Sequence, residues 1–119
     1  MSNETAPATE LSPERFSELI AGGAQLIDVR RPFEYGGGRL AGAQNIEMND
    51  LTAAADAIAR DRPLLLYCRR GNRSAMAADA FRRAGYDAYH LAGGIEAWAD
   101  ADRELEPEDG EVLAPPPPS

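Results

Sequence analysis

The chain has 119 residues, of which 44% are hydrophobic and 27% charged, a size and mixture that fit one globular domain and exclude two. No apolar run reaches the ~18 residues that a membrane span needs, and the first residues lack the basic start and apolar stretch of a secretory signal. The single cysteine, Cys68, excludes an intramolecular disulfide and a zinc site built on thiolates, so we expect a cytoplasmic protein with no metal or cofactor.

The net charge of −8 comes from 20 acidic and 12 basic residues, and much of it is placed near the C-terminus. Residues 100–119 hold seven acidic residues and one arginine, whereas the rest of the chain is nearly neutral. Because an acidic chain repels phosphates and no basic helix is evident, we expect neither nucleic acid nor a membrane as partner. Nothing in the sequence demands more than a monomer.

The chain divides into three parts by composition. Residues 1–10 are polar and unpatterned, and we expect them to be flexible. Residues 11–102 carry the apolar periodicity of the domain. Residues 103–119 are acidic and end in a run of prolines, which predicts a disordered tail whose removal changes neither stability nor activity.

The first half of the domain starts with a helix, in which Ser12 is the cap and Pro13 the first residue, and Gly22 and Gly23 end it. A short buried strand is predicted over 26–29. Pro32 and the triple glycine at 36–38 indicate a loop or a short helical turn. A brief strand around Ile46 follows, and then an alanine-rich helix capped by Asn49 that runs to Ile58.

The second half continues the alternation of strands and helices. Residues 64–67 form a continuous apolar run, as in a central parallel strand covered on both faces. A helix that ends before Gly85, a strand over 88–91 and a short helix over 95–99 follow. This order predicts an α/β fold: a parallel central sheet of about five short strands with helices on both faces. Ligands in such sheets collect at the carboxyl ends of the strands, where Cys68 lies.

The loop after Cys68 has the composition of a site for a reactive sulfur. Its residues are Cys68, Arg69, Arg70, Gly71, Asn72, Arg73 and Ser74. Loop amides can converge on the sulfur, the following helix adds its positive end, and three arginines add positive charge, all of which favour a thiolate. Gly71 permits a backbone conformation that helps the loop to curl. The alternative is a buried cysteine that acts as a small hydrophobic residue.

The segment Cys68-x-x-Gly71-x-Arg73 resembles the active-site loop of rhodaneses, which are thiosulfate and persulfide sulfurtransferases. Further matching motifs are Asp28-Val29-Arg30 with Glu34-Tyr35, Gly42-Ala43-x-Asn45-Ile46, and Gly93-Gly94-Ile95-x-x-Trp98. The four motifs occur in order over about residues 11–100. One departure is Arg39-Leu40-Ala41, where the family often has His-Ile-Pro; this change makes the rim more basic and affects the expected donor preference.

The resemblance implies a transfer of sulfane sulfur through a persulfide on Cys68. The Cys68 thiolate attacks the outer sulfur of thiosulfate or of a persulfide, and a thiophilic acceptor, cyanide or a thiol, then takes that sulfur. The loop amides hold the persulfide, Arg69 and Arg70 meet the anionic donor, and Arg73 braces the loop. A protein that accepts or carries the persulfide is a further possible partner.

Two other functions use a similar fold. Phosphatases and arsenate reductases carry a cysteine–arginine loop one residue longer, whereas four residues separate Cys68 from Arg73 here. A smaller loop suits one sulfur atom better than a tetrahedral oxyanion. The second alternative is a rhodanese-like interaction or persulfide-carrier module; modules of this non-catalytic kind usually lack the cysteine that this chain retains.

Four residues outside the loop have structural and functional interpretations. Asp28 and Arg30 either orient the Cys68 loop or form a structural ion pair. His90, the single histidine, is better explained as a structural or surface residue than as a partner in a Cys–His dyad. Trp98 is expected to pack under the Gly93-Gly94 turn.

Overall fold

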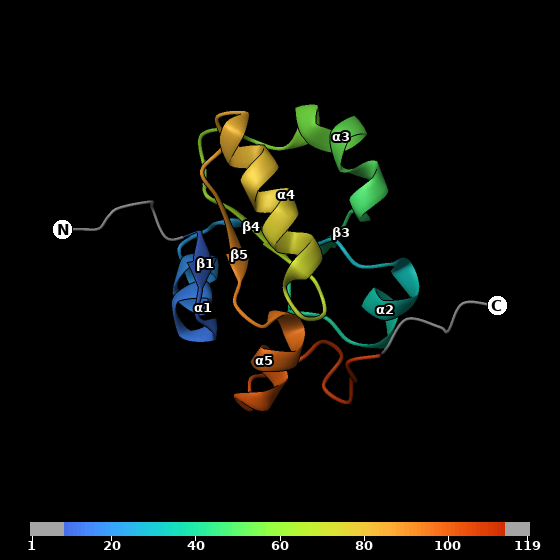
Figure 1. Cartoon of the computed structure of the whole chain (residues 1–119). Helices are drawn as coiled ribbons and strands as arrows, with labels where there is room; N and C mark the ends of the chain where they lie inside the picture. Colours follow the sequence, from blue (N-terminus) through green and yellow to red (C-terminus); the bar gives the residue numbers. More distant parts are fainter. Residues whose placement is uncertain (1–8, 114–119) are drawn as a thin grey trace.

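The computed structural model describes residues 9–113 and contains one five-stranded sheet whose paired strands are all parallel (Figure 1). The strand order is β1-β5-β4-β2-β3. The strands are β1 (Glu10–Leu11), β2 (Gln25–Asp28), β3 (Gln44–Asn45), β4 (Leu64–Tyr67) and β5 (Ala88–Leu91). The α-helices are α1 (Pro13–Ala21), α2 (Pro32–Gly37), α3 (Leu51–Ala54), α4 (Asn72–Arg83) and α5 (Gly94–Asp100). The expected α/β architecture is confirmed.

Strand β4 is the centre of the core, and all four of its residues are fully buried. Alternate side chains of a strand point to opposite faces. Leu64 and Leu66 accordingly pack in one apolar cluster with residues of α3 and α4, and Leu65 and Tyr67 pack in a second cluster with residues of α1 and α5. Helices therefore cover both faces, which explains why this strand has no polar position.

Several local signals have the expected effect. The Ser12 side chain accepts a hydrogen bond from the Arg15 amide at the start of α1, Pro13 is the first helical residue, and Gly22 caps the C-terminus. The alanine-rich segment differs from its expectation. It is broken into a 3₁₀ turn over Met48–Asp50, the short helix α3 and a second 3₁₀ turn over Ala55–Ala57, so that Asn49 lies inside a turn and caps no long helix. The packing of Leu51 and Ile58 into the core outweighs the helix preference of alanine here.

The N-terminal boundary of the domain lies earlier than residue 11. Glu10 and Leu11 form β1, an edge strand beside β5, and the His90 amide donates to the Thr9 carbonyl at 2.8 Å. Thr9 and Glu10 therefore do not belong to a flexible segment. The strand is too short to show an alternating pattern, which is why the sequence did not indicate it. Residues 1–8 lie outside the described part of the chain.

The C-terminal boundary also differs from the expected one, because residues after 102 pack on the domain. Arg39 and Glu106 exchange backbone hydrogen bonds of 3.1 and 2.7 Å, and the Glu111 amide donates to the Gly37 carbonyl at 2.8 Å. Leu105 and Val112 contact the cluster on the α1 and α5 side of the sheet. In Figure 1 this segment runs from α5 toward α2. The expected tail over 103–119 is thus wrong for residues 103–113, and the proline run lies outside the described residues.

The triple glycine in the α2 region makes this packing possible. A Cβ atom on Gly38 would collide with the backbone of Glu111, and one on Gly37 would collide with the Leu113 side chain. Arg39 pairs with Glu106 at 3.6 Å and lies over the Tyr35 ring, so it is engaged with the C-terminal segment. Over residues 9–113, no helix is both long and apolar enough to cross a membrane.

Candidate active site

Cys68 follows β4 directly and is 1% exposed. Strands β4 and β2 are neighbours at the centre of the sheet. From β4 the chain continues to β5 on one side of this pair, and from β2 it continues to β3 on the other side, so the loops that follow β2 and β4 diverge. Such a point, at the carboxyl ends of neighbouring parallel strands, is the usual place for a ligand in an open α/β sheet. The position of Cys68 therefore follows from the strand order as well as from its local sequence.

Three hydrogen-bond donors point at the Cys68 sulfur. The Gly71 amide lies 3.1 Å from Sγ, the Ser74 amide 3.5 Å and the Ser74 hydroxyl 3.4 Å. Gly71 reaches this geometry with a φ of 109°, in the left-handed region that favours glycine, and it caps α4. The donors and the N-terminal end of a 12-residue helix together stabilise negative charge on the sulfur.

Helix α5 holds the loop in place through backbone contacts. The Ile95 amide donates to the Cys68 carbonyl at 2.9 Å, and the Glu96 amide donates to the Arg69 carbonyl at 3.1 Å. Gly94, with a φ of 64°, lies so close that a Cβ atom there would overlap the Arg69 carbonyl group. The Gly93-Gly94 turn is therefore a support of the Cys68 loop, a role that its sequence motif did not reveal.

Each of the three loop arginines is paired with a carboxylate. Arg69 and Arg70 both approach Oε2 of Glu96, with N–O distances of 2.8 and 3.4 Å. Arg73 lies 3.5 Å from Oε1 of Glu34, a fully buried residue of α2. The positive charge expected for the loop is thus partly neutralised. In the sequence Glu34 belongs to a motif and Glu96 carries no signal of its own, because each carboxylate contacts arginines distant in sequence.

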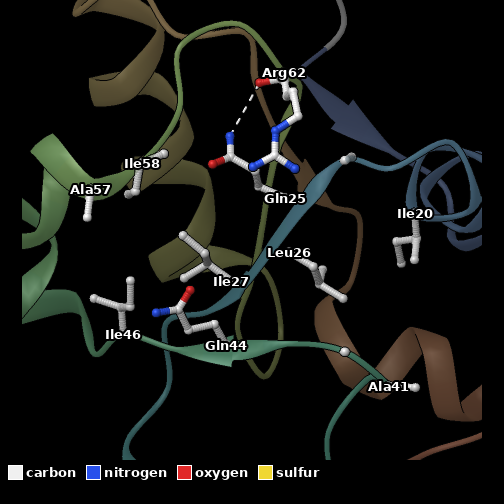
Figure 2. A pocket seen from close by; sticks show the side chains of 12 residues that line it. Ile20, Gln25, Leu26, Ile27, Ala41, Gln44, Ile46, Ala57, Ile58 and Arg62 are labelled. Carbon is white, nitrogen blue, oxygen red and sulfur yellow. Dashed lines mark hydrogen bonds between the residues drawn. The ribbon is translucent and has the colours of Figure 1, made fainter.

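The space beside the sulfur is small. A cavity of about 110 Å³ is lined by Cys68, Arg69, Arg70, Asn72 and Arg73. A wider hollow of about 440 Å³ lies over β2 and β3, where Gln25 bonds to the Arg62 carbonyl among apolar neighbours (Figure 2). That hollow contains neither the cysteine nor a loop arginine. Of the sites expected from the sequence, Asn72 and the three arginines border the cavity, while Gly71 and Ser74 bind the sulfur.

Asp28 and Arg30 form a fully buried ion pair with an N–O distance of 2.7 Å. Burial by itself would lower the pKa of Arg30, but hydrogen bonds and the charge of Asp28 outweigh it and raise the pKa. Arg30 also donates to the Gly38 carbonyl and lies 5.6 Å from the centre of the Tyr67 ring. Among the described residues, no hydrogen bond of this pair reaches residues 69–74. The pair thus connects β2 to the end of α2 and lies against Tyr67, the residue before Cys68.

His90 and Trp98 occupy structural positions. His90 is 6% exposed, and within the described chain the donors to the Cys68 sulfur come from Gly71 and Ser74 and not from this imidazole. Trp98 packs edge-on against Phe16 at 6.5 Å between ring centres and donates to the Glu104 carbonyl at 3.0 Å. Over residues 9–113, no cluster of three or more metal-ligating side chains is found.

Comparison with known proteins shows one consistent family. The model of the rhodanese-like domain matches residues 12–101. Thiosulfate sulfurtransferase GlpE of Pseudomonas paraeruginosa is 39% identical over 92 residues, which cover 74% of this chain and 81% of that protein. The uncharacterized protein YqhL of Bacillus subtilis is 43% identical over 76 residues, or 63% of this chain and 60% of YqhL. A rhodanese-related protein of Thermoplasma volcanium superposes with a TM-score of 0.76 at 28% identity, covering 81% of this chain and 95% of that one.

Proposed function

Because the chain belongs to the rhodanese-like domain family, we propose that it moves a sulfane sulfur from thiosulfate or a persulfide donor, through a persulfide on Cys68, to cyanide or a thiol. The similarity to GlpE supports sulfurtransferase activity in general. The observation that carries the specific proposal is the set of three donors at 3.1 to 3.5 Å around the Cys68 sulfur.

The proposed reaction has two displacements at sulfur. In the first, the Cys68 thiolate attacks the outer sulfur of thiosulfate; a new S–S bond forms, the original S–S bond breaks, and its electron pair leaves with sulfite. In the second, cyanide or a thiolate attacks the outer sulfur of the persulfide, and the Cys68 thiolate is the leaving group. No net oxidant is needed. Since Cys68 is the single cysteine of this chain, the acceptor comes from outside it.

The residues of the Cys68 loop have different proposed roles. Gly71 and Ser74 stabilise charge on the reacting sulfur, because their donors reach Sγ. Arg69 and Arg70, 25% and 65% exposed in their side chains, meet the anionic end of the donor. Arg73 braces the loop through Glu34, and Asn72 borders the cavity. We propose no metal or cofactor for this chemistry, no nucleic-acid or membrane partner, and a monomer in the cytoplasm.

A persulfide carrier that passes sulfur to a protein thiol is a second candidate. Between residues 9 and 113, two large apolar side chains are exposed, Phe33 by 55% and Met76 by 68%. Phe33 lies on α2, whose Glu34 contacts Arg73, and Met76 lies on α4 one turn after Arg73. We propose that a protein acceptor approaching Cys68 contacts α2 at Phe33, beside the residue that pairs with Arg73. Phe33→Ser should slow discharge of the persulfide to a cysteine-containing protein and leave discharge to cyanide unchanged.

The intact mass of the protein after incubation with thiosulfate tests the covalent step. We expect the mass of one added sulfur atom, removed again by cyanide with formation of thiocyanate. Cys68→Ser should show no such adduct and no thiosulfate-to-cyanide transfer, because serine lacks a nucleophile that forms a persulfide. Its melting temperature should stay close to that of the parent, since the two side chains differ little in volume. Normal turnover by this variant would contradict the proposal.

A further inference from the structure

Glu96 lies between the two arginines that face the donor and competes with any anion for them. Its Oε2 atom is 2.8 Å from Nε of Arg69 and 3.4 Å from Nε of Arg70. The Glu96 side chain is 35% exposed, so it borders solvent on the same side as Arg70. A thiosulfate dianion that binds these guanidinium groups has to replace this carboxylate or bind beside it.

The other carboxylate at the loop has a different role. Glu34 is fully buried, and its Oε1 atom accepts from the Arg31 amide at 3.2 Å and from Arg73 at 3.5 Å. A donor anion cannot reach it from solvent, and its charge acts on the arginine that braces the loop. Glu96 is therefore the carboxylate whose charge bears directly on an incoming anion.

The Glu96 side chain is separable from the support that α5 gives the loop. That support consists of backbone bonds from the Ile95 and Glu96 amides to the Cys68 and Arg69 carbonyls. A glutamine at position 96 keeps these bonds and the size of the side chain and removes only the charge. Any effect of Glu96→Gln on donor binding thus reports the carboxylate.

We propose, building on the proposed function, that Glu96 determines donor preference: by offsetting one of the two charges of Arg69 and Arg70, it weakens the binding of dianionic donors such as thiosulfate relative to donors with less charge beside the outer sulfur. The physical basis is the Coulomb interaction between a fixed carboxylate and an anion brought to the same two cations. Arg69, Arg70 and Glu96 together carry one net positive charge at the rim, and without the carboxylate they carry two.

Alkylation of Cys68 measures this effect without any sulfur transfer. Iodoacetate is an anion and iodoacetamide is a neutral molecule of nearly the same shape, and both alkylate the thiolate with loss of iodide. Glu96→Gln should raise the ratio of the iodoacetate to the iodoacetamide rate constant by about threefold or more, as expected for one charge near the path. The gain should shrink at an ionic strength of ~0.5 M, where screening shortens the range of the charge.

Asp79→Asn is the matched control. Asp79 is an exposed acid on α4 that pairs with Arg83 at 3.0 Å, and its replacement changes the net charge by the same amount. Its alkylation ratio should stay within about twofold of the parent, because exposed charges far from the thiolate are screened. In a thiosulfate assay Glu96→Gln should lower KM for thiosulfate by a larger factor than it changes kcat.

Each outcome decides the proposal. An unchanged alkylation ratio in Glu96→Gln, or an equal gain in Asp79→Asn, would refute a local role for the carboxylate. A lower ratio would mean that Glu96 positions the arginines for anion binding, the opposite role. If the parent shows no thiosulfate turnover and no persulfide, the proposed function fails, while the alkylation ratio still tests the effect of Glu96.

Discussion

At the scale of single residues, the Cys68 sulfur shows how a local pattern becomes a site. Cysteine, glycine and serine at positions 68, 71 and 74 could be read from the sequence as a curled loop, and the structure gives the distances from the sulfur to its donors. The partners of the loop arginines could not be read in this way. Glu96 is 26 residues from Arg70 and Glu34 is 39 residues from Arg73, so no local periodicity connects them.

His90 gives a prediction about pH and stability. Burial disfavours the charged imidazolium and lowers the pKa of His90, and the nearby Glu10 carboxylate offsets part of this effect. In the unfolded chain His90 has an ordinary pKa of about 6.5. Just below this pH, His90 is therefore protonated to a larger extent in the unfolded chain than in the folded chain. By linkage, stability is lost as the pH falls through about 6.5 toward the lower pKa of the folded state.

His90→Gln removes this titration, so the variant should lose less stability than the parent between pH 7 and pH 5. The urea midpoint at several pH values measures the difference in slope, whatever offset the substitution itself causes. Parallel curves for the two proteins would show that His90 contributes nothing to the pH dependence.

At the scale of elements, the proposed function predicts that the length of the loop between β4 and α4 favours sulfur over phosphorus chemistry. Four residues separate Cys68 from Arg73, and Asn72 already begins α4. A glycine inserted between Asn72 and Arg73 would move the Ser74 donors away from the sulfur and disturb the contact between Arg73 and Glu34. Thiosulfate-to-cyanide transfer should fall by at least ~100-fold, because misplacement on the order of 1 Å can have that effect.

Hydrolysis of an aryl phosphate is measured alongside sulfur transfer for both the parent protein and the insertion variant. The parent protein should show none, since we expect a loop of this length to suit one sulfur atom better than a tetrahedral oxyanion. Phosphatase turnover by the unmodified protein that matched its thiosulfate turnover would contradict the sulfurtransferase proposal. A loop insertion that left sulfur transfer intact would show that the donors around Sγ are dispensable.

The predictability of the elements differs with their length and packing. Helices α1 and α4 and strands β2, β4 and β5 have enough apolar periodicity or capping residues to be located from sequence. Strand β1 has two residues, and it exists because β5 offers an edge to pair with. The segment from Met48 to Ala57 is rich in helix-forming residues but consists of a short α-helix between two 3₁₀ turns. Helix propensity is a weak local preference, and tertiary packing overrides it here.

At the scale of the whole molecule, the C-terminal segment is a structural part of the domain. A chain that ends at residue 105 would lose the backbone pairing of Glu106 with Arg39, the bond from Glu111 to Gly37, and the packing of Val112. Compared with a chain that ends at residue 113, it should be less stable by about 2 kcal/mol. This corresponds to a melting temperature lower by roughly 6–10 °C.

Thermal unfolding of the two truncated chains, followed by circular dichroism, measures this difference. Gly38→Ala in the longer chain provides an independent check, because its Cβ would collide with the Glu111 backbone and displace the same segment. Equal melting temperatures for all three proteins would show that residues 106–113 do not stabilise the domain.

The sequence by itself determined the alternation of strands and helices, the burial of β4 and the composition of the Cys68 loop, because each depends on residues within a few positions of one another. Only the tertiary structure decided that Glu34 and Glu96 hold the loop arginines and that Gly94 supports the loop from α5. It also decided that Gly37 and Gly38 are covered by the C-terminal segment. These contacts join segments that are distant in sequence and that the strand order brings together. The charge and size of a side chain allow many different partners, and only the fold determines which partner is in reach.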